Sequence, residues 1–287
     1  MQQSTPNLRQ KVLDQPWSLW WIQAQRLTRI ELRRNLFSWR ASWIYFLAFI
    51  PTFIIFIHMV VDTHPAFALN DDTNVLAGII QLYYIRLGVF FGCLRIFSRL
   101  IRGEMIERSL HFYLLSPVRR EVLLISKFVA GSITAVLLFG SAVIADFALM
   151  YVGFGAAARD YIFNGAGLGQ LEAYLLIIVL ACLGYGAVFL LFSMMFRNPI
   201  PAAMLFLGWE TISPVLPSLL QKFSVTAYLH HLMPVKVAAE GLFALLTVET
   251  EPVSGWAAVG GLLLLIVVVI CYSCYRIRRL EIRYTTE

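Results

Sequence analysis

Ionisable side chains are concentrated in one segment that interrupts the apolar sequence, RGEMIERSLHFYLLSPVRREVLLISK, residues 102–127. Read as a helix, it has an apolar stripe formed by Ile106, Leu110, Tyr113 and Leu114. A second face carries the polar and charged residues Glu104, Glu107, Arg108 and His111. Glu104 and Arg108 have the i,i+4 spacing of an ion pair, and Pro117 ends the helix. A short helix with these two faces predicts docking, with the bilayer or helix bundle on one side and a soluble partner on the other.

Three charged residues, Arg86, Asp146 and Glu210, lie inside apolar runs. An unpaired charge in hydrocarbon costs on the order of 3 kcal/mol, so each of them needs a partner or a function. Arg86 and Glu210 each lie about eleven residues from the start of their run, which puts both roughly 16 Å deep. We therefore expect these two residues to form an intramembrane ion pair or to line a translocation path. Asp146 is the alternative partner of Arg86.

Catalytic and metal-binding patterns are weak by comparison. Four cysteines lie in apolar runs: Cys93, Cys182, Cys271 and Cys274. The last two make a CxxC spacing, but no second pair is available to complete a zinc site. The adjacent His230 and His231 fit interfacial histidines better than metal ligands. We expect no catalytic residue, no metal site and no cofactor bound by this chain.

The elements that must position these residues are membrane-spanning helices. The chain has 287 residues, of which 59% are hydrophobic and only 14% are charged. Several apolar runs are long enough to cross about 30 Å of hydrocarbon. We predict an all-α polytopic membrane protein with six transmembrane helices. Their approximate bounds are 41–61, 76–98, 123–152, 171–196, 199–220 and 255–275.

Cations set the orientation and the organisation of the chain. Lys and Arg are dense before the first span, around the second connection and after the sixth span. The positive-inside rule therefore predicts that both termini are cytoplasmic. The chain then divides into a cytoplasmic segment 1–40, a transmembrane domain 41–275 and a cytoplasmic tail 276–287. The long second connection is 99–122, and an external re-entrant region is 221–254. The fifth span, which precedes this region, carries four prolines, and we expect them to break its outer end.

The cytoplasmic segment contains an amphipathic helix of its own. Arginines with helical spacing form one face: Arg26, Arg29 and Arg33. Tryptophans lie mostly on the other side: Trp17, Trp20 and Trp21. Tryptophans opposite arginines suit an interfacial helix that lies in the headgroup plane, with membrane lipids as its partner. The net charge of +6 also fits attraction to anionic headgroups, and we do not expect nucleic acid to bind.

Two stretches resemble a known family. ERSLHFYLLSPVRREVLLISK, residues 107–127, is similar to the signature loop of the permease subunits of type 2 ABC exporters. In that loop an acidic residue, a short helix, Leu-Leu, Ser/Thr-Pro-Val, Arg and Lys follow in this order. HLMPVKVAAEGL, residues 231–242, is similar to the family's external segment before its last span. The chain departs from the commoner pattern at 109–111, where Ser-Leu-His replaces Gly-Thr-Leu.

The resemblance implies a transport subunit of the cell (inner or plasma) membrane of a prokaryote. Such permeases pair into a dimer, usually of identical chains, and each binds a separate cytoplasmic ATPase subunit. ATP and Mg²⁺ would be bound in that partner, since this chain contains no GxxxxGK[S/T] phosphate-binding loop. The resemblance assigns Glu104, Glu107, Arg108 and His111 to the face that couples to the ATPase. It places Arg86 and Glu210 near a path lined by the second and fifth spans.

Two other function classes stay open. An ion-gradient-driven secondary transporter or channel would suit the intramembrane Arg86, Asp146 and Glu210, although no inverted repeat relates the two halves of the chain. An intramembrane enzyme would need a catalytic constellation at one depth, and His58 is the only histidine in a predicted span. The sequence does not indicate which substrate is moved.

Overall fold

The structure is a computed structural model that describes residues 16–61, 69–106, 118–213, 216–235 and 254–279. The fold is all-helical, as predicted, and no strand occurs in these ranges. The elements in chain order are α2 (Trp17–Phe37), η1 (Trp39–Ala41), α3 (Ser42–Val61), α4 (Leu69–Gly78), η2 (Ile79–Gly88), α5 (Val89–Ser98), η3 (Arg99–Gly103), α6 (Glu104–Ile106), α8 (Arg120–Val152), α9 (Gly155–Phe163), α10 (Gly167–Met195), α11 (Pro199–Ile212), α12 (Ser218–Gln221), α13 (Val225–His230) and α14 (Gly255–Arg278).

Four continuous helices are long and apolar enough to cross a membrane. They are Asp72–Gly103, Arg120–Val152, Gly167–Met195 and Gly255–Arg278. A fifth candidate is the bent pair Trp17–Phe37 and Ser42–Ile57, whose two halves meet at 64°. Four or five such helices are compatible with a multi-pass membrane protein.

The predicted span 199–220 is not one helix. α11 has 14 residues, about 21 Å at 1.5 Å per residue, which is shorter than the roughly 30 Å of a hydrocarbon core. The short helices α12 and α13 follow it, and Pro217 is the N-cap of α12. This break agrees with the expectation that the prolines interrupt the outer end of the run.

Small residues let the long helices approach closely. The buried ring of Phe97 lies against Gly131 of α8 and Gly186 of α10, where an added Cβ would come within 2.8 and 2.6 Å of it. Phe139 of α8 fills the equivalent space beside Gly92 of α5. These contacts explain why α5, α8 and α10 form the centre of the bundle.

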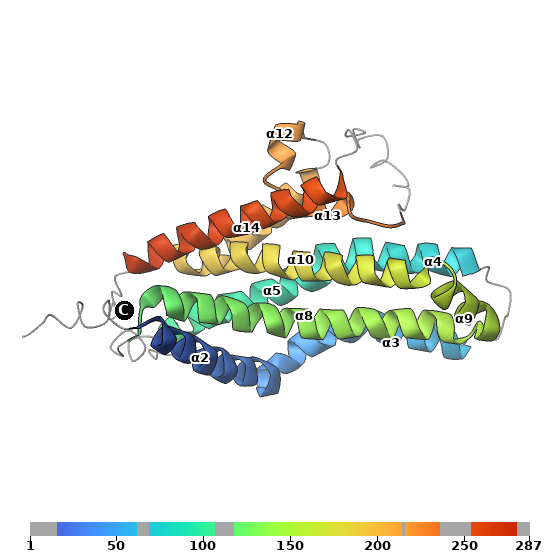
Figure 1. Ribbon diagram of the computed structural model, residues 1–287, viewed down its shortest axis with the longest axis horizontal. Helices are drawn as coiled ribbons and strands as arrows, with labels where there is room; N and C mark the ends of the chain where they lie inside the picture. Colours follow the sequence, from blue (N-terminus) through green and yellow to red (C-terminus); the bar gives the residue numbers. More distant parts are fainter. Residues whose placement is uncertain (1–15, 62–68, 107–117, 214–215, 236–253, 280–287) are drawn as a thin grey trace, which may run out of the picture.

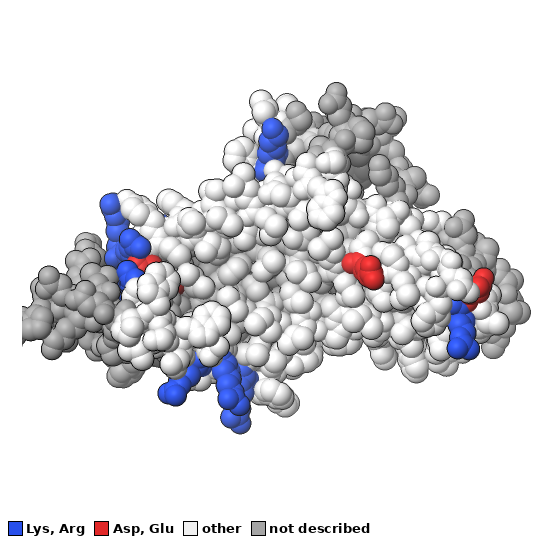
Figure 2. Space-filling view, viewed as in Figure 1, with Lys and Arg blue, Asp and Glu red and all other residues white. Residues whose placement is uncertain are grey.

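The long helices run along the longest axis of the molecule, and α2 crosses α8 obliquely near one end (Figure 1). α9 lies at the opposite end (Figure 1). At the end where α2 crosses α8, the start of α8 is also joined to the end of α14, because Arg120 donates to the carbonyls of Ile277 and Arg278. We call this the basic end; its arginines are Arg26, Arg29, Arg33, Arg34, Arg119, Arg120, Arg276, Arg278 and Arg279. Figure 2 shows blue side chains gathered at this end, beside a wide zone with little charge.

Candidate functional site

A cluster of four charged side chains lies at the basic end, where three helices meet. Its members are Glu31 and Arg34 of α2, Glu104 of α6 and Lys127 of α8. The Lys127 ammonium pairs with the Glu31 carboxylate and lies 2.8 Å from Glu104 Oε1. An Arg34 guanidinium nitrogen lies 2.9 Å from a carboxylate oxygen of each glutamate. We call these four residues the charge network.

Three of the four side chains of the charge network are removed from solvent. The side chains of Lys127 and Glu104 are each 1% exposed and that of Glu31 is 2% exposed, whereas Arg34 is 41% exposed. Burial raises the pKa of the Glu104 carboxyl, and the nearby Lys127 ammonium opposes this shift. Two cations and two carboxylates balance one another, which is the condition under which buried charges are tolerated.

This geometry changes the role expected for Glu104. The sequence places it on a face open to a soluble partner, but the structure turns it inward to Lys127 and Arg34. The carboxylate is therefore not available for direct contact with a partner in this structure. The other residues predicted for this face, Glu107, Arg108 and His111, lie outside the described ranges.

α2 is attached to α8 by more than the charge network. The guanidinium carbon of Arg119 lies 4.4 Å from the centroid of the Trp20 ring, within the range of a cation–π contact. Thr28 Oγ1 donates to the carbonyl of Ser126 at 3.4 Å. Trp20 therefore packs on the protein, whereas Trp17 and Trp21 are 81% and 67% exposed.

The arginines of the predicted interfacial face have a different environment. Arg26, Arg29 and Arg33 are all exposed. They are therefore accessible to lipid headgroups, as are the outward tryptophan rings of α2. Contact of this helix with membrane lipids stays a prediction.

Asp146 of α8 lies at a second polar site, inside the bundle. Its side chain is 0% exposed, and its oxygens contact the hydroxyls of Thr52 in α3 and Tyr84 in η2. The Tyr84 hydroxyl is 2.7 Å from Asp146 Oδ2 and 3.1 Å from the carbonyl oxygen of Ala48. Among the described residues, the ion pairs of the chain do not include Asp146.

A proline explains why two tyrosines face α3 at this point. Pro51 lies inside α3 and has no N–H to donate to the carbonyl of Leu47, four residues earlier. The Tyr83 hydroxyl donates to this carbonyl instead, at 2.6 Å. Tyr83 and its neighbour Tyr84 belong to η2, a π-helical segment, and irregular helical turns of this kind are frequent at functional sites.

Glu210 of α11 has partners other than the predicted Arg86. Its carboxylate accepts hydrogen bonds from Ser224 Oγ at 2.8 Å and from the backbone N–H groups of Val225 and Thr226, each at 2.9 Å. The prediction for Glu210 considered only charged side chains as its partners. Because the chain breaks after α11, the first N–H groups of α13 become free to bind this carboxylate.

Arg86 of η2 does not pair with Glu210 within the chain, and no ion pair involves it in the part of the chain that the structure describes. Its charge instead acts on His230, beside the start of the predicted external region. Burial, together with the positive charge of Arg86 and the neighbouring His231, lowers the pKa of His230 to about 4. His230 is therefore neutral at pH 7. The region 236–253 lies outside the described residues.

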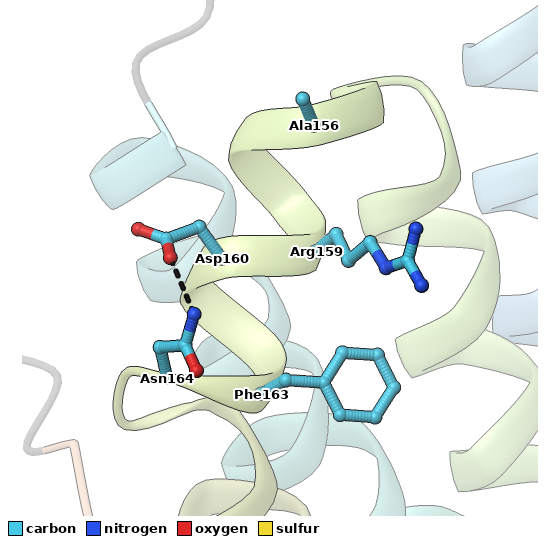
Figure 3. A pocket seen from close by; sticks show the side chains of 5 residues that line it. All are labelled: Ala156, Arg159, Asp160, Phe163 and Asn164. Carbon is cyan, nitrogen blue, oxygen red and sulfur yellow. Dashed lines mark hydrogen bonds between the residues drawn. The ribbon is translucent and has the colours of Figure 1, made fainter.

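A surface hollow at the end opposite the basic end is formed by α9 and the residue after it. It is lined by Ala156, Arg159, Asp160, Phe163 and Asn164. Asn164 Nδ2 donates to Asp160 Oδ1 at 2.8 Å, while Arg159 and Phe163 point to the other side of the helix (Figure 3). Their polar groups do not converge on a common point, so this hollow has no feature of a substrate site.

The sequence did not indicate that Glu31 and Lys127 belong together. Two features of the sequence could have suggested the pair. Glu31 is the sole acidic residue between Asp14 and Asp62, and Lys127 is followed by a long apolar run. Each needs an opposite charge. No family model matches the chain, and no curated protein matches its sequence.

Proposed function

We propose that the chain is the membrane-spanning permease subunit of a type 2 ABC exporter, with six spans and both termini in the cytoplasm. The support is the loop pattern of residues 107–127 together with the concentration of arginines at the basic end. In this proposal the basic end faces the cytoplasm. ATP and Mg²⁺ are bound by a separate ATPase subunit, and α2 rests on the lipid headgroups.

The observation that carries the proposal is the contact between Glu104 and Lys127. These residues lie near the two ends of the charged segment 102–127. Glu104 comes just before the family-like pattern of residues 107–127, and Lys127 is its last residue. A connection needed only to join two spans would not require buried ions at its base. A connection that receives force from a soluble partner does, because the charge network links it to both α2 and α8.

The inward position of Glu104 divides the predicted coupling residues into two groups. Glu107, Arg108 and His111 contact the ATPase in this proposal. Glu104 positions the base of the connection through Lys127 and Arg34. Substitutions at Glu107, Arg108 and His111 should therefore weaken ATPase binding without destabilising the permease. A substitution at Glu104 should also lower the stability of the permease.

A second copy of the chain completes the proposed path. α11 exposes large apolar side chains, with Leu205 79% and Ile200 57% exposed, and a Cβ added at Gly208 would meet no other described residue within 4 Å. Such a face is suited to a second α11 or to lipid. In the dimer, Arg86 and the second and fifth spans would line the route of the substrate.

The test is copurification of the ATPase encoded beside this chain with the tagged permease. The double variant Glu107→Lys/Arg108→Glu should lose ATPase binding and stimulation while it keeps its melting temperature and membrane insertion. Arg276→Glu, an exposed site at the basic end outside the connection, is the matched control and should bind normally. Unchanged binding and stimulation in the double variant would refute coupling through this loop.

An ion-gradient-driven transporter or channel is the second candidate. The observation in its favour is Asp146, a buried carboxyl group inside a candidate span whose hydrogen-bond partners, among the described residues, are the hydroxyl groups of Thr52 and Tyr84. Isolation of the chain without any ATPase, combined with transport that a protonophore abolishes, would favour this candidate over the permease.

A further inference from the structure

The side chain of Asp146 occupies an environment that is unsuited to a free carboxylate. It is 0% exposed and lies within the candidate span Arg120–Val152. Its partners, Thr52 and Tyr84, are neutral hydroxyl groups. An ionised carboxylate that is buried in apolar surroundings without a cation is strongly disfavoured relative to the protonated acid.

The oxygen atoms around Asp146 outnumber the hydroxyl protons available to join them. The Tyr84 hydroxyl has one proton, yet it lies within hydrogen-bond distance of both Asp146 Oδ2 and the Ala48 carbonyl. A proton on Asp146 Oδ2 resolves this shortage. Asp146 then donates to Tyr84, and Tyr84 donates to Ala48. Thr52 meanwhile donates to the other carboxyl oxygen, Oδ1.

Glu210 is a buried carboxyl group whose hydrogen bonds fit the ionised form instead. Its carboxylate receives three donors, two of which are backbone N–H groups that cannot act as acceptors. No extra proton is needed there. The two buried carboxyl groups of the candidate path thus have opposite hydrogen-bond requirements, one for an acceptor-only carboxylate and the other for an acid that also donates.

A metal ion does not fit in place of this proton. The Tyr84 hydroxyl and Asp146 Oδ2 are only 2.7 Å apart and in direct hydrogen-bond contact. A Mg²⁺ or Ca²⁺ ion needs six or more oxygen ligands, and no group of three or more His, Cys, Asp or Glu side chains that could hold a metal occurs among the described residues. A proton needs no additional space.

We infer that Asp146, Thr52, Tyr84 and the Ala48 carbonyl form a proton-binding site in the interior of the protein, with Asp146 protonated at neutral pH. The proton comes from water, and no electron moves. Tyr83 and Tyr84 are the titratable groups that face Asp146 from η2, and α3 contributes the Thr52 hydroxyl and backbone carbonyls. Loss of the proton would leave a buried anion where α3, η2 and α8 meet.

The site lies where the helices are irregular. α3 contains Pro51, and η2 is π-helical, so both elements depart from regular α-helical hydrogen bonding beside Asp146. Protonation therefore controls a contact between two elements that can change their geometry. The inference holds for a permease driven by a separate ATPase and for an ion-driven transporter, because it concerns a site and not the energy source.

Infrared spectroscopy of the purified full-length chain in lipid nanodiscs tests the inference. At pH 7 the wild type should show the C=O stretch of a protonated carboxyl group, and Asp146→Asn should lose that band. The matched control is Glu210→Gln, which removes the other buried carboxyl group of the candidate path and should leave the band in place. A band that is unchanged in Asp146→Asn would overturn the assignment.

A second pair of variants keeps the test decisive if Asp146→Asn does not fold. Tyr84→Phe and Thr52→Val each remove one hydroxyl partner of Asp146 while they keep its carboxyl group. Each should shift the band to a different frequency, because the hydrogen bonding of the acid changes. If neither substitution moves it, the protonated group lies elsewhere and the inference is wrong.

Discussion

Lys127 is the residue around which the basic end is organised. Its ammonium is 1% exposed and contacts one carboxylate on α2 and another on α6, two elements that are distant from each other in the sequence. The same lysine is the last residue of the family-like loop pattern. From the sequence, Lys127 looks like a charged residue that only flanks a span. In the structure it links three elements, so its replacement should lower stability as well as alter the topology signal.

The charge network should show coupled energetics. Lys127→Met removes one of the cations that contact the buried Glu31 and Glu104 carboxylates, and we expect a loss of about 3 to 5 kcal/mol of stability. Adding Glu104→Gln removes one of these carboxylates and should recover part of the loss. Melting temperatures of the single and double variants in detergent measure the coupling. Losses that simply add would contradict a shared network.

His230 should make the protein sensitive to acid. Its pKa in the folded state, about 4, lies below the ordinary value of 6.5, so the folded protein binds fewer protons than the unfolded chain between these values. The stabilisation is present above pH 6.5 and is lost as the pH falls towards 4, by at most about 3 kcal/mol. Melting temperatures between pH 7 and 4 should fall less steeply for His230→Gln than for the wild type. His231→Gln should have a smaller effect in the same direction, because His231 contributes to lowering the pKa of His230. Equal slopes for the wild type and His230→Gln would exclude this role of His230.

At the scale of elements, apolar runs and prolines in the sequence predicted the long helices. They did not predict which side chains from distant parts of the sequence pair with one another. Apolar length alone gives the helices around residues 123–152 and 255–275, and four prolines predicted the break after α11. The Glu31–Lys127 pair could not be predicted in this way, because the two residues are 96 positions apart. The partners of Glu210 were missed for another reason: two of them are backbone N–H groups of Val225 and Thr226, which have no signature in the side-chain sequence.

Pro51 of α3 and the Tyr83 hydroxyl of η2 should be energetically coupled. Tyr83→Phe leaves the Leu47 carbonyl without its hydroxyl donor, which should cost about 1 to 3 kcal/mol. In a Pro51→Ala background residue 51 regains its N–H and can serve this carbonyl, so the same substitution should cost much less. A double-mutant cycle on melting temperature measures the difference.

Tyr45→Phe is the control for this cycle, since the Tyr45 hydroxyl also donates to a backbone carbonyl, that of Leu36, but at an exposed position. It should be nearly neutral in both backgrounds. An equal cost of Tyr83→Phe with and without Pro51 would show that the tyrosine does not compensate for the proline.

The whole molecule is a bundle with chemically different ends. The basic end joins α2, the start of α8 and the end of α14, whereas α9 lies at the other end (Figure 1). A wide zone with little charge separates the two ends on the face seen in Figure 2. This polarity motivates a definite orientation in the membrane, with α9 outside.

Cysteine labelling measures that orientation. In a background without the four native cysteines, a single cysteine at Asp160 of α9 should react with an impermeant reagent added to intact cells. A cysteine at Arg279, after α14, should react only once the cells are opened. Both positions are exposed, so accessibility of the side chain does not distinguish them. The reverse pattern would invert the proposed topology and would place the charged connection outside the cell.

The position of Lys127 in the sequence also bears on how the protein is made. Glu31 and Glu104, the two carboxylates that its ammonium contacts, both precede it in the chain. A ribosome therefore completes both partners before it reaches the lysine. When α8 enters the bilayer during synthesis, its buried cation can be neutralised at once by segments that already exist, and no later part of the chain has to arrive first. This order of synthesis makes both carboxylate partners of the buried lysine available as soon as α8 is complete.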